Sequence, residues 1–105
     1  MNTVADVTEH SIAELVSLAG RTAVVTGGAQ GLGKGIARRL AEAGANVLIG
    51  DRNETQAKAA AAELDARYPG TVTATAMDVR DSASVAAAAR QASAEFGGID
   101  IWVNN

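Results

Sequence analysis

Five glycines fall within residues 26–35, TGGAQGLGKG, between a short β-branched run and a segment of helical periodicity. The run before them, residues 22–26 (TAVVT), is continuous and apolar, as in a parallel strand that is covered on both faces. The segment after them, residues 32–43, carries an apolar stripe and stops at Gly44. This stripe, which we expect to face inward, comprises Leu32, Ile36, Leu40 and Ala43, with Ala37 and Ala41 beside it. A strand, a flexible loop and a helix in this order predict one unit of an α/β fold.

The same alternation of short apolar runs and longer helical segments continues along the chain. Further strands are predicted at residues 45–51, 71–77 and 99–105, and helices lie between them. We therefore expect an α/β fold built on a parallel sheet, with four strands and three helices. Residues 1–20 form a lead-in with a helical turn at 11–20 and an exposed His10, ahead of the α/β unit at 21–105.

Capping signals mark the starts of the second and third helices. Asn53, with Gln56 three residues later, forms a capping box for the second helix, and Asp81 or Ser82 caps the third. The residues predicted to face inward are Ala57, Ala60, Ala61 and Leu64 in the second helix and Val85, Ala89, Ala92 and Phe96 in the third.

The composition excludes several classes of function. The formal net charge is -3 and the chain has no block of Lys and Arg interleaved with aromatics, which argues against nucleic acid as the main partner. The sequence has no cysteine, so disulfides, zinc-thiolate sites and thiol catalysis are removed, and we predict no metal site. The opening residues form neither a basic nor an apolar leader, and no run is long enough to span a bilayer. We therefore expect a cytoplasmic protein without a membrane partner.

The glycine loop predicts an anion site. Backbone N–H groups at a helix N-terminus attract phosphate, and glycines allow both positive φ and a close approach of the phosphate to the backbone. One glycine would suffice for a tight turn from strand to helix. Five glycines therefore favour a bound phosphate ligand.

Two nucleotide motifs compete for this loop. Residues 28–34, GAQGLGK, match the first seven positions of the P-loop pattern, in which a lysine reaches the phosphates and the next residue offers a hydroxyl to Mg²⁺. That next position is Gly35, so a nucleoside triphosphatase stands only as a weaker alternative, and Lys34 is interpreted as a solvated residue of the first helical turn. The second motif is a Thr-Gly-x-x-x-Gly-x-Gly spacing formed by Thr26, Gly27, Gly31 and Gly33.

With this spacing after the first strand, residues 20–105 resemble the short-chain dehydrogenase/reductase family. The resemblance implies that Gly27, Gly31 and Gly33 form the turn that admits the pyrophosphate of a dinucleotide. It also implies that Leu32 begins the helix beneath that pyrophosphate. For the fold, the resemblance implies that residues 21–105 are an NAD-binding half-domain of Rossmann type, the first half of a doubly wound parallel sheet with its four strands in the order 3-2-1-4.

Three further elements of the resemblance follow the later strands. Asp51 comes 18 residues after the last glycine of the motif, close to the spacing of about 20 for the acid that binds the adenosine ribose. Asp78 and Val79 resemble the family's Asp-Val pair that contacts adenine, and Asn104 and Asn105 match the first two residues of its Asn-Asn-Ala-Gly motif. Each residue alone could end a strand, solvate a loop or form a turn. Together, at the carboxyl ends of strands where such folds bind ligands, they predict a dinucleotide site.

The choice of cofactor depends on Asp51 and Arg52. A carboxylate accepts hydrogen bonds from both ribose hydroxyls but repels a 2'-phosphate, by about 1 kcal/mol per charge pair at 4 Å in water and about 4 at an effective dielectric of 20. Arg52 could offset part of this repulsion by pairing with the phosphate. Because the acid ends the strand and the arginine comes one residue later, we expect NAD rather than NADP.

The family's catalytic residues, a Ser and a Tyr-x-x-x-Lys pair, belong to the second half of its fold, and this chain contains no equivalent. Tyr68 cannot replace the tyrosine because position 72 is Val, not Lys. We therefore expect part of a longer, homo-oligomeric oxidoreductase that transfers hydride between NAD(H) and an alcohol or ketone substrate. The fourth strand would otherwise expose an apolar edge. The alternative is a stand-alone, non-catalytic dinucleotide-binding module.

Overall fold

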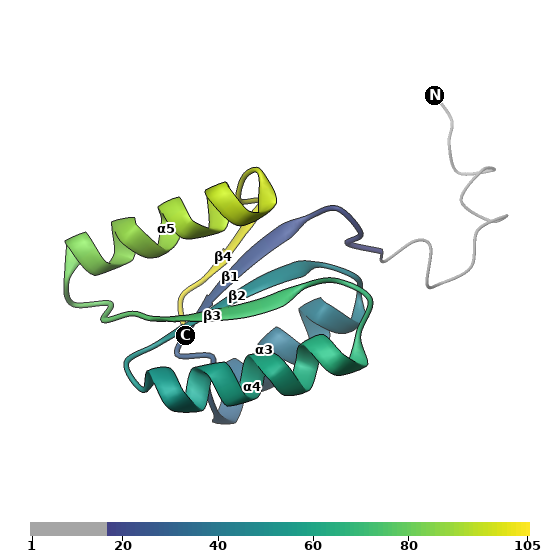
Figure 1. The fold of residues 1–105 in the computed structure, drawn as a ribbon, viewed down its shortest axis with the longest axis horizontal. Coiled ribbons are helices and arrows are strands. Elements are labelled where there is room, and N and C mark those ends of the chain that lie inside the picture. The colour runs from purple at the N-terminus through teal and green to yellow at the C-terminus, as the bar shows by residue number, and fades with distance from the viewer. Residues whose placement is uncertain (1–16) are drawn as a thin grey trace, which may run out of the picture.

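The computed structural model describes residues 17–105, so His10 and most of the predicted lead-in turn lie outside the described residues. The described chain alternates strand and helix throughout (Figure 1). The strands are β1 (Thr22–Thr26), β2 (Asn46–Asp51), β3 (Val72–Ala76) and β4 (Ile101–Val103), and the helices are α3 (Gly31–Glu42), α4 (Glu54–Arg67) and α5 (Ser82–Phe96).

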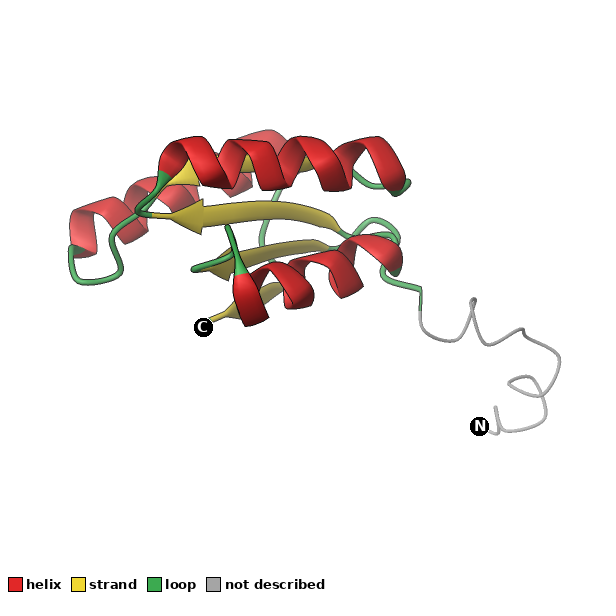
Figure 2. Ribbon diagram, turned by 90° about the horizontal axis from the view of Figure 1, so that it is seen from below, coloured by secondary structure: helices red, strands yellow, loops and turns green. Residues whose placement is uncertain are grey.

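The four strands form one parallel sheet in the order β3-β2-β1-β4, as predicted. Val24 of β1 lies between Leu48 of β2 and Trp102 of β4 in the register. Helices α3 and α4 cover one face of the sheet and α5 covers the other, so the sheet is wound on both sides (Figures 1 and 2). All carboxyl ends of the strands therefore meet at the same edge of the sheet.

The strands divide the buried side chains between two cores because neighbouring residues of a strand point to opposite faces. Ala23 and Val25 face α3 and α4, whereas Val24 faces α5. Much of the helical contribution to both cores is alanine, including Ala37, Ala57 and Ala92. Small side chains let the helices lie close to the sheet.

The inward face of α3 differs from the predicted stripe. Its buried residues are Gly33, Ala37 and Ala41, whereas the side chain of Leu32 is 74% exposed. The prediction that Leu32 faces inward was wrong, because a face of glycine and alanine allows the helix backbone itself to lie against the sheet. The larger Ile36 and Leu40 of the predicted stripe are only partly buried. In α5 the buried residues are likewise Ala88 and Ala92.

The predicted caps are present with one change. The side chain of Asn53 accepts a hydrogen bond from the Gln56 backbone N–H at 3.0 Å, but the Gln56 amide donates to Gln30 instead of completing a capping box. The N-cap of α5 is Asp81, whose carboxylate accepts from the Ala83 N–H at 2.9 Å. No helix among residues 17–105 is long and apolar enough to cross a membrane.

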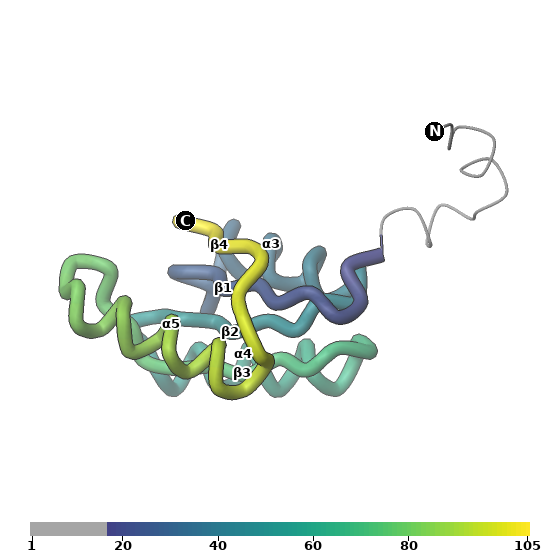
Figure 3. The backbone as a smooth tube through the Cα atoms, turned by 90° about the horizontal axis from the view of Figure 1, so that it is seen from above, coloured from purple at the N-terminus to yellow at the C-terminus, as the bar shows by residue number. Residues whose placement is uncertain are grey.

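Strand β4 is shorter than the predicted 99–105, and side-chain hydrogen bonds join both of its flanks to β1. Before it, the carboxylate of Asp100 accepts from the Thr22 N–H at 2.9 Å. After it, the Asn105 N–H donates to the hydroxyl of Thr26 at 3.0 Å. The chain end thus lies beside the end of β1 (Figure 3).

Candidate functional site

The glycine loop turns directly from β1 into α3 and requires glycine both for its backbone conformation and for space. Gly27 and Gly31 have φ angles of +62° and +59°, which side chains rarely adopt. A Cβ on Gly33 would overlap the Gly27 carbonyl oxygen and lie 2.6 Å from the Asn105 Nδ2 atom. The first turn of α3 therefore packs against the loop that precedes it.

The N-terminus of α3 is suited to an anion. Its N-cap, Gln30, makes no side-chain capping bond, whereas the N-caps of α4 and α5 do. The first turn of α3 also contains no acidic residue. First-turn N–H groups have no partner within their own helix, and the helix dipole favours negative charge there. Together with the glycine cradle, this end of α3 fits a phosphate group.

Asp51 ends β2 beside the glycine loop. Its Oδ2 accepts a hydrogen bond of 3.2 Å from the Ala29 N–H, and its Oδ1 accepts one of 3.0 Å from the Asn53 N–H. Each oxygen of an ionised carboxylate can accept more than one hydrogen bond. The carboxylate thus fixes the loop and retains capacity to accept bonds from ligand hydroxyls.

A pocket of about 140 Å³ joins predicted residues that follow all four strands. It is lined by Gly27, Asp51, Arg52, Met77, Val79 and Asn105. Of these, Met77 was not predicted. It is 3% exposed and packs under Gly50, where a Cβ would lie 2.6 Å from its Cε. Its only sequence signal is its place directly before Asp78.

Asp78 lines a second pocket of about 300 Å³, together with Arg52 and Met77. Arg80 binds it through three donors: the backbone N–H at 2.9 Å, Nε at 3.1 Å and Nη2 at 3.0 Å. The side-chain hydrogen bonds from Arg80 lower the pKa of Asp78 from its usual 3.8 to about 2. Sequence reasoning did not single out Arg80, and its position two residues after the acid is the signal that could have found it.

The side chains of the two asparagines after β4 have different partners. The side chain of Asn105 donates to the Gly27 carbonyl at 3.2 Å, whereas the side chain of Asn104 accepts from the Trp102 indole N–H at 2.9 Å. Only Asn105 reaches the glycine loop. Neighbouring residues of an extended chain point to opposite sides, so only one of the pair can do so.

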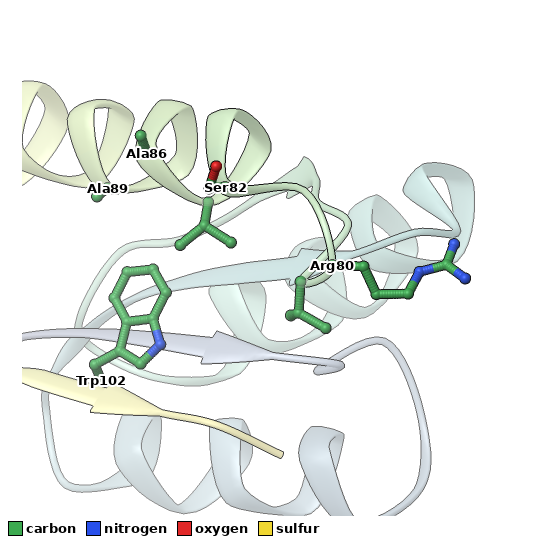
Figure 4. A pocket seen from close by; sticks show the side chains of 7 residues that line it. Arg80, Ser82, Ala86, Ala89 and Trp102 are labelled. Carbon is green, nitrogen blue, oxygen red and sulfur yellow. The ribbon is translucent and has the colours of Figure 1, made fainter.

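An open groove of about 490 Å³ lies between α5 and β4 and contains no residue of the glycine loop (Figure 4). The ring of Trp102 faces α5 across this groove, whereas the Arg80 side chain is directed away from it (Figure 4). Val79 lines both the groove and the 140 Å³ pocket. The groove is mostly apolar, so we assign the polar candidate site to the smaller pockets.

The sequence suggested that Lys34 is simply solvated, but in the structure it forms an ion pair. Its ammonium group lies 2.8 Å from the Glu63 carboxylate of α4, and this contact lowers the pKa of Glu63. The lysine thus connects α3 to α4, which explains it without a P-loop function.

The parallel, doubly wound sheet and the glycine loop at the start of its first helix define a Rossmann-type α/β domain. The family model described as short chain dehydrogenase matches residues 21–105. The chain belongs to the short-chain dehydrogenase/reductase family, whose members are oxidoreductases.

Similar proteins support this membership. The chain is 42% identical over 95 residues to the short chain dehydrogenase/reductase dpmpG of Macrophomina phaseolina, covering 90% of this chain and 54% of that protein. It is 45% identical over 85 residues to a 2-dehydro-3-deoxy-L-rhamnonate dehydrogenase (NAD(+)) of a Sphingomonas species, covering 81% of this chain and 32% of that protein. A crystal structure of a dehydrogenase/reductase from Sinorhizobium meliloti has a TM-score of 0.84 and 39% identity, covering 90% of this chain and 37% of the other. The chain thus spans from about a third to half of the length of these relatives.

Proposed function

We propose that this chain supplies the NAD-binding part of an oxidoreductase that transfers hydride between NAD(H) and an alcohol or ketone. The observation that carries this proposal is the 140 Å³ pocket, to which each of the four strands contributes a residue at its carboxyl end. Dinucleotides bind at this edge in open α/β sheets, where the winding reverses direction. Here the reversal lies between β1 and β4.

Each part of the cofactor would have its own partners. Gly31, Leu32 and Gly33 would bring backbone N–H groups to the pyrophosphate, because the helix end is uncapped by a side chain. Gly27 would shape the turn that admits the pyrophosphate, since its own N–H donates to the Gly50 carbonyl at 2.7 Å. Asp51 would accept hydrogen bonds from the adenosine ribose.

The adenine and the nicotinamide ends would lie on either side of this centre. Asp78 and Val79 would contact adenine beside Arg52, since these residues line the adjoining pockets. Asn105 would hold the glycine loop in place, and Asn104 would contact the cofactor through its backbone. Bound NAD supplies the hydride acceptor or donor, and we assign no catalytic side chain to this chain.

NAD is the favoured cofactor because the carboxylate of Asp51 would repel a 2'-phosphate. The Sphingomonas relative carries NAD(+) in its name. Arg52 is exposed at the next position and could offset part of that repulsion, so the preference is a matter of degree.

Isothermal titration of the 105-residue chain with NAD, NADP and Mg²⁺-ATP tests the proposal. We expect NAD to bind more tightly than NADP, and Mg²⁺-ATP not to bind measurably. Preference for Mg²⁺-ATP would overturn the proposal in favour of a nucleoside triphosphatase. The absence of any dinucleotide binding would overturn it as well.

A further inference from the structure

Hydrogen bonds hold Asp78 through both its backbone and its side chain. Its backbone N–H donates to the Ser84 hydroxyl at 2.9 Å, and its carbonyl oxygen accepts from the Asp81 N–H at 3.0 Å. Its side chain accepts all three bonds from Arg80. Both the backbone and the plane of the carboxylate are therefore fixed.

The bonds from Arg80 leave part of the Asp78 carboxylate able to accept a further hydrogen bond. An ionised carboxylate has about four lone-pair positions, two on each oxygen. The backbone N–H and Nε of Arg80 occupy both positions on Oδ1, and Nη2 occupies one on Oδ2. One acceptor position on Oδ2 is left by these bonds. A side chain that offers one acceptor in one direction selects a ligand with a donor at the matching place.

We propose that Arg80 is a positioning residue that fixes Asp78 to accept a hydrogen bond from the exocyclic amine of adenine, and that it thereby selects adenine over purines bearing a carbonyl oxygen there. This inference rests on the proposed function, since it assigns the pocket of Asp78 to the adenine end of the cofactor. A carbonyl oxygen facing the same carboxylate would place two acceptors against each other, which is repulsive. The selection depends on the fork of the guanidinium, because its two side-chain donors fix the plane of the carboxylate.

The test compares NAD with nicotinamide hypoxanthine dinucleotide, which carries a carbonyl in place of that amine. Both dissociation constants are measured by titration for the wild-type chain and for Arg80→Ala, Arg80→Lys and Arg90→Ala. Arg90 is exposed on α5, so its variant removes the same charge away from Asp78. Circular dichroism checks that each variant is folded, which the 68% exposure of the Arg80 side chain favours.

We expect the wild type and Arg90→Ala to bind NAD about tenfold more tightly than the hypoxanthine dinucleotide, from the strength of a hydrogen bond to a charged group. In Arg80→Ala this ratio should fall to about threefold or less. In Arg80→Lys the ratio should fall to a similar extent, because an ammonium keeps the charge but does not fix the carboxylate plane.

Failure of this inference is distinguishable from failure of the proposed function. If the wild type binds NAD without discriminating between the bases, the role of Arg80 is wrong and the proposed function stands. An unchanged ratio in Arg80→Ala, or a full ratio in Arg80→Lys, would likewise overturn the positioning role. If the wild type binds neither dinucleotide, the proposed function fails and this inference fails with it.

Discussion

Thr26 and Asn105 join the end of the first strand to the end of the fourth. The hydroxyl of Thr26 accepts a hydrogen bond of 3.0 Å from the Asn105 N–H and donates one of 3.2 Å to the Val103 carbonyl. Thr26 is 2% exposed, so these two bonds satisfy a hydroxyl that is shielded from water. The pair lies at the place where the winding of the sheet reverses, directly beneath the glycine loop.

Thr26→Val should destabilise the chain by about 1 kcal/mol, because it keeps the shape but removes the hydroxyl that bonds the Asn105 N–H and the Val103 carbonyl. Urea unfolding measures this loss, and hydrogen exchange of the Asn105 amide should become faster. Thr26→Ser keeps the hydroxyl and should lose less stability than Thr26→Val. Equal losses in both variants would show that the hydroxyl does not matter.

Gly33→Ala should displace the glycine loop, because its Cβ would overlap the Gly27 carbonyl oxygen. We expect a loss of about 1 to 3 kcal/mol in stability, typical of overpacking, and at least about a tenfold loss of NAD affinity. Gly35→Ala is the matched control, since a Cβ there would meet no atom within 4 Å. That control should gain about 0.5 to 1 kcal/mol from helix propensity and keep its affinity. Retained NAD affinity in folded Gly33→Ala would contradict the proposed phosphate site.

Asp51→Asn should weaken NAD binding and shift preference towards NADP by about fivefold or more, because it removes a repulsion of about 1 kcal/mol per charge pair at 4 Å in water. Titration with both cofactors measures the shift. Asp65→Asn changes the same charge at the opposite edge of the sheet, near the start of β3, and should leave the preference unaltered. An unaltered preference in Asp51→Asn would place the ribose elsewhere.

The ion pair between Asp78 and Arg80 should appear in an acid titration. The lowered pKa of Asp78, about 2 against a usual 3.8, means that the folded state favours the ionised carboxylate. Its contribution to stability is therefore present above about pH 3.8 and is lost as the pH falls towards 2. NMR titration of the Asp78 carboxyl group measures this pKa directly, and Arg80→Ala should return it towards 3.8. The same low pKa in Arg80→Ala would assign the shift to another group.

The inward face of α3 can be tested at Leu32. Leu32→Gln should change stability by no more than about 0.5 kcal/mol, because the side chain is 74% exposed. Leu64→Ala should cost about 2 to 5 kcal/mol, because Leu64 is fully buried. Chemical denaturation distinguishes the two, and a large loss in Leu32→Gln would favour the stripe predicted from the sequence.

The sequence alone determined the types, order and approximate bounds of the elements. Runs such as 22–26, caps such as Asp81 and the glycine-rich loop act through neighbouring residues, so they are visible without a fold. The strand order 3-2-1-4 came from the resemblance to the short-chain dehydrogenase/reductase family, because a doubly wound sheet can also have another order.

Tertiary structure decided which side chains meet. The apolar stripe of α3 runs through the larger Leu32, Ile36 and Leu40, whereas packing on the sheet selected the small residues Gly33, Ala37 and Ala41 as its buried face. Only the parallel register brings Asn105 to Gly27, 78 residues away in the chain. Two further hydrogen bonds also connect separate elements. Asp51 at the end of β2 bonds Ala29 of the glycine loop, and Lys34 of α3 bonds Glu63 of α4. Sequence patterns record local preference, whereas such contacts depend on how the layers pack, and this packing forms the candidate site.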